Sequence, residues 1–227
     1  MNKRTIVTDS KRASKAASSV KSATRPPHPL VGAEFVTGAA AMSQLPAPSV
    51  PEIAFAGRSN AGKSTAINVL AGRTRLAFAS RTPGRTQQIN LFSLRSGALV
   101  ADLPGYGYAA VGKELKRAWQ EFLWQYITTR PTLVALVLIV DSRHGLKELD
   151  LELLEGFVPS GRPILILATK GDKLNTSDQR AAVATVHKQL AEKFPLGATN
   201  VTVQLFSATA RIGIAEAEAV ISGWLQG

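Results

Sequence analysis

The sequence predicts an α/β fold of three layers, in which a mostly parallel six-stranded sheet carries helices on both faces. Continuous apolar segments such as residues 133–141 and 163–169 alternate with amphipathic helical segments. This alternation is typical of parallel strands that are buried on both sides. Only the tripeptide RSG separates residues 89–94 from residues 98–102, so these two segments are expected to form a hairpin that contains one antiparallel strand.

The six predicted strands are short runs of aliphatic, β-branched and aromatic residues. In chain order they are EIAFA (52–56), INLFSL (89–94), ALVAD (98–102), LVALVLIVD (133–141), PILILAT (163–169) and VTVQLFSA (201–208). The longest apolar run, 133–140, is far shorter than the roughly 20 residues that a membrane-spanning helix needs. It is therefore interpreted as a buried strand, and no membrane partner is expected.

Helices are predicted between the strands because apolar residues recur there at intervals of three and four. The stretch STAINVLAG (64–72) follows the first strand and is compatible with a helix. Four later stripes share helical spacing and are interpreted as core faces: Leu115, Trp119, Phe122, Tyr126 and Ile127; Leu149, Leu153, Leu154 and Phe157; Val183, Val186 and Leu190; and Ile214, Ala217, Ile221 and Leu225.

Residues 1–30 are predicted to form a disordered basic tail. Residues 1–29 carry seven lysines and arginines but a single acid, Asp9, in a chain whose formal net charge is +11. Such a polar segment cannot bury enough surface to fold alone. It is interpreted either as a solvated tail or as an arm that touches nucleic acid. Residues 31–50 are expected to be a linker with a short edge strand in AEFVTGAA (33–40), and residues 51–227 to be the main domain.

The chain contains no cysteine. Disulfides and zinc sites made of thiolates are therefore excluded, and the composition fits a reducing compartment. The basic first residues lack the apolar segment of a secretory signal. We therefore expect a cytoplasmic protein.

A phosphate-binding loop is predicted where the first strand meets the first helix. Gly57, Gly62, Lys63 and Ser64 match the pattern G-x-x-x-x-G-K-[ST] without a gap. The glycines let the backbone aim its N–H groups at an anion, and the helix adds its positive end. Lys63 can reach the outer phosphates, and the Ser64 hydroxyl can bind Mg²⁺. The residues expected to contact the phosphates are Gly57, Arg58, Ser59, Asn60, Ala61, Gly62, Lys63, Ser64 and Thr65.

A second candidate segment, DLPG, follows the strand at residues 98–102. Asp102 at the strand end can hold magnesium through water, and the N–H of Gly105 can sense a γ-phosphate. The two residues between them, Leu103 and Pro104, are expected to line the same loop. After a strand, and later in the chain than a phosphate-binding loop, this otherwise weak pattern becomes a strong signal.

The base of the nucleotide is predicted from TKGD, at the carboxyl end of a buried strand, where open α/β sheets bind ligands. The Asp172 carboxylate can accept hydrogen bonds from the N1–H and the 2-amino group of guanine, a donor pair that adenine lacks. The stem of Lys170 can cover the base. A second loop, FSA (206–208), follows another strand and can direct its backbone at guanine O6. The two loops indicate GTP and GDP as ligands, and their residues are Thr169, Lys170, Gly171, Asp172, Phe206, Ser207 and Ala208.

In this order, the motifs resemble those of the TRAFAC-class P-loop GTPases, and most closely those of the EngB (YihA/YsxC) family of ribosome-biogenesis GTP-binding proteins. The resemblance is carried by GRSNAGKS, TPGRTQQINLF, DLPGYGYA, DSRHGLKELD, ATKGDKL and FSA, within about residues 33–226. It implies a GTPase domain whose partner is the large ribosomal subunit or its rRNA. One departure is Thr169, which stands where asparagine is commoner in GTPases, so a modest nucleotide affinity is expected.

The resemblance also assigns the loop TPGRTQQ. Spacing alone leaves Thr82 and Thr86 open as the residue that joins Ser64 on Mg²⁺, and the resemblance implies Thr86. Together with Lys63 and Gly105, Thr86 is then a candidate catalytic residue. The residues of this loop implied to contact the nucleotide are Gly84, Arg85, Thr86, Gln87 and Gln88.

The inferred reaction is in-line attack of water on the γ-phosphate, with Lys63, Mg²⁺ and backbone N–H groups stabilising the developing charge. Many GTPases place a glutamine after D-x-x-G, but this chain has Tyr106. A phenol with a reference pKa of about 10 is a poor base at neutral pH, so hydrolysis is expected to be slow without a partner. Asn60 has two open interpretations, as a K⁺ ligand beside the phosphates or as a brace of the loop.

The leading interpretation is a monomeric GTPase switch that hydrolyses GTP to GDP and phosphate during assembly of the large ribosomal subunit. Two alternatives stay open at this point. One is a GTP-binding factor in cell division or septation, and the other is a GTP sensor that binds a partner without hydrolysis.

Overall fold

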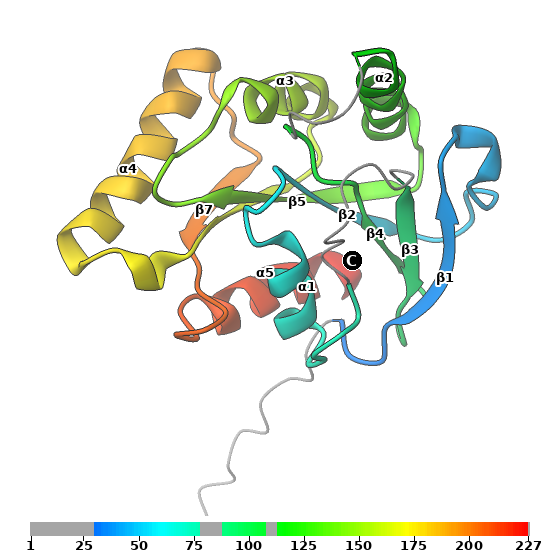
Figure 1. Ribbon diagram of the computed structural model, residues 1–227, viewed down its shortest axis with the longest axis horizontal. Coiled ribbons are helices and arrows are strands. Elements are labelled where there is room, and N and C mark those ends of the chain that lie inside the picture. The colour runs from blue at the N-terminus through cyan, green and yellow to red at the C-terminus, as the bar shows by residue number, and fades with distance from the viewer. Residues whose placement is uncertain (1–29, 78–87, 108–112, 227) are drawn as a thin grey trace, which may run out of the picture.

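The computed structural model describes residues 30–77, 88–107 and 113–226, which form a sheet with helices on both sides (Figure 1). Residues 1–29 of the predicted basic tail (1–30) lie outside the described residues, whereas its last residue, Leu30, is described and buried. The strands are β1 (Glu34–Ala39), β2 (Glu52–Gly57), β3 (Ile89–Ser93), β4 (Leu99–Asp102), β5 (Leu133–Asp141), β6 (Ile164–Thr169) and β7 (Val201–Leu205). The helices are α1 (Lys63–Leu70), α2 (Lys113–Thr129), α3 (Glu148–Phe157), α4 (Thr176–Lys193) and α5 (Ile214–Gln226), with short 3₁₀ turns η1 (Met42–Gln44), η2 (Val158–Ser160) and η3 (Gly171–Lys173).

The strands form one sheet in the order β1-β3-β4-β2-β5-β6-β7. Strand β2 pairs in parallel with β4 and β5, and the parallel part continues through β6 to β7. Strand β3 is antiparallel to both β4 and β1, which confirms the predicted hairpin and its single reversed strand. The sheet has seven strands where the sequence predicted six and an edge strand in a linker, because that edge strand, β1, pairs with β3.

The segment before β2 contributes to the domain. Leu30 and Ala33 are fully buried, in the core that also contains the apolar faces of α1 and α5. In β1 itself only Ala39 is buried, and Phe35 is largely exposed. The Phe35 ring meets the ring of Phe92 edge to face across the β1–β3 pair. This half-exposed strand therefore closes the edge of the sheet.

Helices α2, α3 and α4 cover one face of the sheet, and α1 and α5 cover the other (Figure 1). Strand β2 is buried on both sides, since Ala54 and Ala56 belong to the first core and Ile53 and Phe55 to the second. The predicted helical stripes supply buried residues to these cores: Phe122, Tyr126, Ile127, Leu153, Leu154, Phe157, Val186, Leu190, Ile214, Ala217 and Ile221. Within the described residues, no helix is both long and apolar enough to cross a membrane.

A buried carboxylate lies at the amino ends of the parallel strands, where β2 begins. Glu52 has no exposed surface, and its oxygens accept hydrogen bonds from Tyr126 Oη (2.7 Å), Thr132 Oγ1 (2.7 Å), and Arg130 Nε (2.9 Å) and Nη2 (2.6 Å). A buried charge is tolerated when it is paired and fully hydrogen-bonded in this way. The opposite edge is the carboxyl edge of the sheet, where the carboxyl ends of β2, β4, β5, β6 and β7 lie together because these strands run parallel.

Candidate functional site

The predicted phosphate-binding loop connects the end of β2 to α1 at this carboxyl edge. A Cβ atom on Gly57 would lie 2.6 Å from the carbonyl oxygen of Ile139 in the neighbouring strand β5, so a side chain is sterically excluded. Gly62 has a φ of 102°, in the left-handed region that favours glycine. It is the N-cap of α1, and the first turn of α1 contains no acidic residue. The N–H groups at the start of this helix therefore face the loop without a capping side chain, as an anion site requires.

Lys63 and Asp102 meet directly, although they lie on different elements. Lys63 begins α1, Asp102 ends β4, and Lys63 Nζ forms an ion pair with Asp102 Oδ1. Both side chains are largely buried, with exposed fractions of 10% and 7%. The lysine predicted for the phosphates and the carboxylate predicted for the metal therefore converge on one point.

The DLPG segment continues β4 alongside the phosphate-binding loop. The N–H of Leu103 donates to the carbonyl of Phe55 in β2 (2.9 Å), and the N–H of Ser59 donates to the carbonyl of Tyr106 (2.9 Å). The hydroxyl of Ser59 also donates to the carbonyl of Gly105 (3.3 Å). These bonds hold the two predicted phosphate-contacting segments side by side.

The side chain of Tyr106 is buried in the core beneath α2 and α3. Its hydroxyl donates to Asp150 Oδ1 at 2.7 Å. Burial, the negative charge of Asp150 and this hydrogen bond raise the pKa of Tyr106 well above its ordinary value. The phenolate, the form of Tyr106 that could act as a base, is therefore even scarcer at neutral pH than the sequence suggested.

Two side chains of the predicted guanine loop bind the phosphate-binding loop. The Thr169 hydroxyl is within hydrogen-bonding distance of the carbonyls of Ala61 and Val140, and its single proton serves one of them at a time. Lys170 Nζ donates to the carbonyl of Asn60 (2.7 Å) and to Asp141 Oδ2 (2.8 Å). Thr169 thus joins the predicted guanine loop to the phosphate-binding loop.

The other two predicted base-contacting segments are joined to each other. Ser207 Oγ donates to Asp172 Oδ1 (2.7 Å), and the N–H of Gly171 donates to the carbonyl of Phe206 (3.1 Å). The hydrogen bond from Ser207 is the main reason why the pKa of Asp172 lies below its ordinary value. Asp172 is therefore ionised at neutral pH, the state in which it accepts hydrogen bonds from a base. Ala208 follows in the same loop and packs against the core around α1 and α5.

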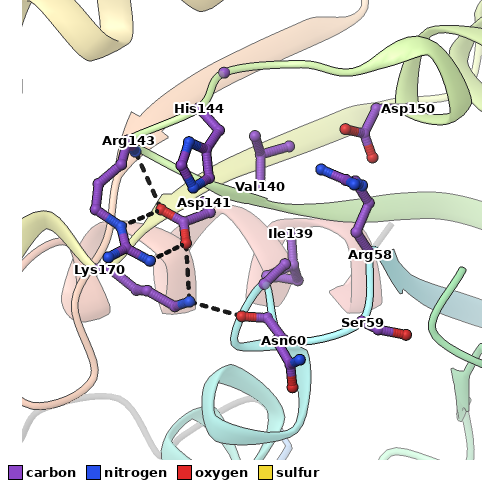
Figure 2. Close-up of a pocket in the computed structure, with 12 residues that line it drawn as sticks. Arg58, Ser59, Asn60, Ile139, Val140, Asp141, Arg143, His144, Asp150 and Lys170 are labelled. Atoms are coloured by element: carbon purple, nitrogen blue, oxygen red, sulfur yellow. Dashed lines mark hydrogen bonds and ion pairs between the residues drawn. The ribbon is translucent and has the colours of Figure 1, made fainter. Parts of the chain in front are cut away.

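A pocket of about 210 Å³ lies between the phosphate-binding loop and the segment after β5 (Figure 2). In it, Asp141 is held by Arg143, through Nε (2.9 Å) and Nη2 (2.7 Å), and by Lys170. Burial alone would raise the pKa of Asp141, but the hydrogen bonds from Arg143 and Lys170 outweigh it and hold the pKa well below its ordinary value. Sequence analysis missed Asp141, although it ends the longest apolar strand and lies in the segment DSRHGLKELD.

Asn68 of α1 is a second residue that the sequence analysis missed. Its Oδ1 accepts hydrogen bonds from the N–H groups of Leu76 (2.9 Å) and Ala77 (2.8 Å), and its Nδ2 donates to the carbonyl of Ala77 (3.0 Å). Asn68 thereby anchors the chain just before the predicted magnesium-binding loop. The available signal was an asparagine among the apolar residues of the second half of this helix.

Most of the predicted loop 82–88 lies outside the described residues: Thr82, Gly84, Arg85, Thr86 and Gln87. Gln88 is described, and its side chain lies against Gly38 of β1, at the sheet edge away from β2. The structure therefore does not bring the Gln88 side chain to the phosphate-binding loop. Asn60 is exposed and adopts a left-handed backbone conformation, with φ of 66°.

The comparisons with known proteins agree with one another on one family. A family model described as a 50S ribosome-binding GTPase matches residues 52–170. The "Probable GTP-binding protein EngB" of Azoarcus sp. is 50% identical over 193 residues, which cover 85% of this chain and 91% of the relative. The protein of the same name from Aromatoleum aromaticum is 51% identical over 193 residues, covering 85% and 88%. A crystal structure of a probable GTP-binding protein engB shares the fold, with a TM-score of 0.59 at 24% identity, covering 77% of this chain and 98% of that one.

Proposed function

The chain belongs to the EngB family of P-loop GTP-binding proteins, and we propose that it is a Mg²⁺-dependent GTPase switch used in assembly of the large ribosomal subunit. The observation that carries this proposal is the convergence of Lys63 and Asp102 beneath the phosphate-binding loop. The loop is also braced by Thr169 and Lys170 from the guanine-binding segment. One edge of the sheet thus holds the groups that this proposal assigns to both ends of the nucleotide.

In this proposal the triphosphate lies along the loop 57–65, and guanine lies at Asp172. The carboxylate accepts hydrogen bonds from N1–H and the 2-amino group of the base, and the Ser207–Asp172 bond fixes one carboxylate oxygen. The backbone of Ser207 and Ala208 faces guanine O6. Selection of guanine over adenine then follows from the donor pair that only guanine offers.

The residues present fit a magnesium ion. The Ser64 hydroxyl and the Asp102 carboxylate are hard oxygen ligands, which Mg²⁺ prefers. Ser64 lies in the first turn of α1, and Asp102 ends β4. Ser64 would bind the ion directly, Asp102 through water, and Thr86 from the loop beyond the described residues. When bound, the ion supplies neutralisation of phosphate charge.

The chain's own groups act on the γ-phosphate as follows. Lys63 exchanges Asp102 for the phosphate oxygens, and the N–H groups of the loop and of Gly105 stabilise the charge that develops in the transition state. Tyr106 is already hydrogen-bonded to Asp150, so its hydroxyl does not orient the attacking water. Hydrolysis is therefore slow until a partner completes the site, and we infer that this partner is a component of the large subunit.

Base selection is tested with Asp172→Asn. Xanthine keeps the N1–H donor of guanine but replaces the 2-amino group by a carbonyl, which an asparagine amide can match. The variant should lose about 100-fold in GTP affinity, corresponding to about one charge-assisted hydrogen bond, that from the 2-amino group, and should gain affinity for XTP. Titration of fluorescent nucleotides measures both effects. Unchanged GTP affinity would contradict the assignment of Asp172.

The ribosomal role is tested by sedimentation of the full chain with large subunits in GDP or in a non-hydrolysable GTP analogue. Co-sedimentation is expected with the analogue and is expected to weaken with GDP. Equal sedimentation in both nucleotides, or none in either, would overturn the switch. Sedimentation of the free protein tests the expected monomer.

Tyr106 also favours a second candidate, a GTP sensor that does not hydrolyse, because its hydroxyl is engaged with Asp150. Single-turnover hydrolysis with and without large subunits separates the two functions, since a sensor shows no phosphate release in either case.

The same hydrolysis assay, run in KCl and in NaCl, tests whether Asn60 holds K⁺. Equal rates in the two salts would assign Asn60 to bracing the loop.

A further inference from the structure

Tyr106 links the predicted γ-phosphate sensor to helix α3. It directly follows Gly105, its ring is buried with 3% of its surface exposed, and its hydroxyl donates to Asp150 Oδ1 at 2.7 Å. Asp150 lies in the first turn of α3 and is 1% exposed. The other oxygen of Asp150 accepts the N–H of Lys147 (2.9 Å) and thereby caps the helix. The Tyr106 side chain is therefore fastened to a capped helix end.

The main chain of the same residue is fastened to the phosphate-binding loop. The carbonyl of Tyr106 accepts the N–H of Ser59 at 2.9 Å, and Arg58 and Tyr106 form a parallel bridge. A Cβ atom on Gly105 would lie 3.1 Å from Ser59 Oγ, so the glycine is closely packed. Gly105 is thus held between the phosphate-binding loop on one side and, through Tyr106, α3 on the other.

The Tyr106 hydroxyl has a cost that simple core packing would avoid. A phenylalanine would fill the same space without burying a hydroxyl and without facing a buried carboxylate. Burial raises the pKa of Asp150, against the hydrogen bonds that it accepts from Tyr106 and Lys147. Arg58 extends from the phosphate-binding loop toward Asp150 and brings a positive charge close to the pair (Figure 2). The hydrogen-bonded pair of Tyr106 and Asp150 therefore lies where the segment after Gly105 meets α3.

We propose that Tyr106 and Asp150 are positioning residues that hold the Gly105 N–H where it meets the γ-phosphate, so that their hydrogen bond strengthens the binding of GTP but not of GDP. This inference rests on the proposed function of the site. GDP has no γ-phosphate to contact Gly105, so its affinity is insensitive to the position of that N–H. With GTP, a loosened Gly105 segment must be ordered on binding, and that ordering weakens the affinity.

The test compares Tyr106→Phe with a matched control elsewhere in the fold. Tyr126 is also buried and also donates to a buried carboxylate at 2.7 Å, that of Glu52, but at the opposite edge of the sheet. Affinities for GDP and for a non-hydrolysable GTP analogue are measured for the full-length wild type, Tyr106→Phe and Tyr126→Phe. Thermal unfolding of the three proteins reports the purely structural loss.

Tyr106→Phe should lower the affinity for the GTP analogue by about fivefold, the effect of one hydrogen bond, while GDP affinity stays within about twofold. Tyr126→Phe should lower the unfolding temperature but leave the ratio of the two affinities unchanged. If Tyr106→Phe leaves the ratio unchanged, or if Tyr126→Phe shifts it equally, the positioning role is overturned. If the wild type binds neither nucleotide, the proposed function itself fails.

A double-mutant cycle tests whether Asp150 is the partner that matters. Asp150→Ala should lower the ratio of GTP to GDP affinity, and adding Tyr106→Phe to it should cause little further loss, because both changes break one bond. Losses that add fully would show that the two residues act separately and would overturn the pairing. The Tyr106→Phe measurement stands alone if Asp150→Ala does not fold.

Discussion

Replacing Thr169 by valine removes one hydroxyl and keeps the shape of the side chain. Thr169 is 3% exposed, and its hydroxyl serves the carbonyl of Ala61 in the phosphate-binding loop or that of Val140 in β5. Losing a neutral hydrogen bond costs about 1 kcal/mol, and leaving a buried carbonyl unsatisfied raises the cost to about 3 kcal/mol. For a domain of this size, each kcal/mol lowers the unfolding temperature by about 2–4 °C.

The same bond fixes the phosphate-binding loop, so Thr169→Val should also weaken GDP binding, by about tenfold if about 1.4 kcal/mol of the loss appears in the binding step. Thermal unfolding and titration of a fluorescent GDP measure the two effects. The matched control is Thr185→Val, where an exposed hydroxyl donates to the carbonyl of Ala181 (2.8 Å) within α4. The control should change neither quantity appreciably. Wild-type affinity and stability in Thr169→Val would refute the bracing role.

Two further predictions concern charges. The pKa of Asp141 lies below its ordinary value of 3.8 in the folded protein, so the stability that it contributes is present above about pH 3.8 and is lost as the pH falls. The difference in unfolding free energy between wild type and Asp141→Asn, measured in urea, should therefore shrink on acidification. A difference that is constant with pH would refute this prediction. Arg130→Ala should lower the free energy of unfolding by about 3–5 kcal/mol, since it removes two hydrogen bonds from the buried Glu52 carboxylate and leaves its charge unpaired. GDP affinity of the folded Arg130→Ala variant should be unchanged because the network lies at the opposite edge, and a large loss of affinity would contradict that separation.

The sequence predicted the interior of the sheet better than its edge. Strands β5 and β6 are continuous apolar runs buried on both faces, so composition alone locates them. Strand β1 has three exposed residues, two intermediate ones and one buried one, a pattern that gives little hydrophobic signal. Its pairing with β3 depends on backbone hydrogen bonds to residues far along the chain.

The residues of the candidate site were predicted because phosphate and guanine recognition require particular residue types at short spacings. The tertiary contacts among them were not predictable in the same way. Lys63 and Asp102 are 39 residues apart, and the Thr169 hydroxyl reaches a carbonyl 108 residues earlier. Only the parallel arrangement of β2, β4 and β6 brings these groups to one edge.

Tyr106 shows what residue identity determines and what only tertiary structure determines. The sequence by itself determined that no glutamine follows DLPG and that a phenol is a poor base, because both depend only on residue identity. Which way the side chain turns was decided by tertiary structure, through a carboxylate 44 residues further on, at the start of α3. Local patterns specify chemistry and strand or helix character over short spacings, whereas the direction of a side chain depends on the free energy of packing against segments that only folding brings near.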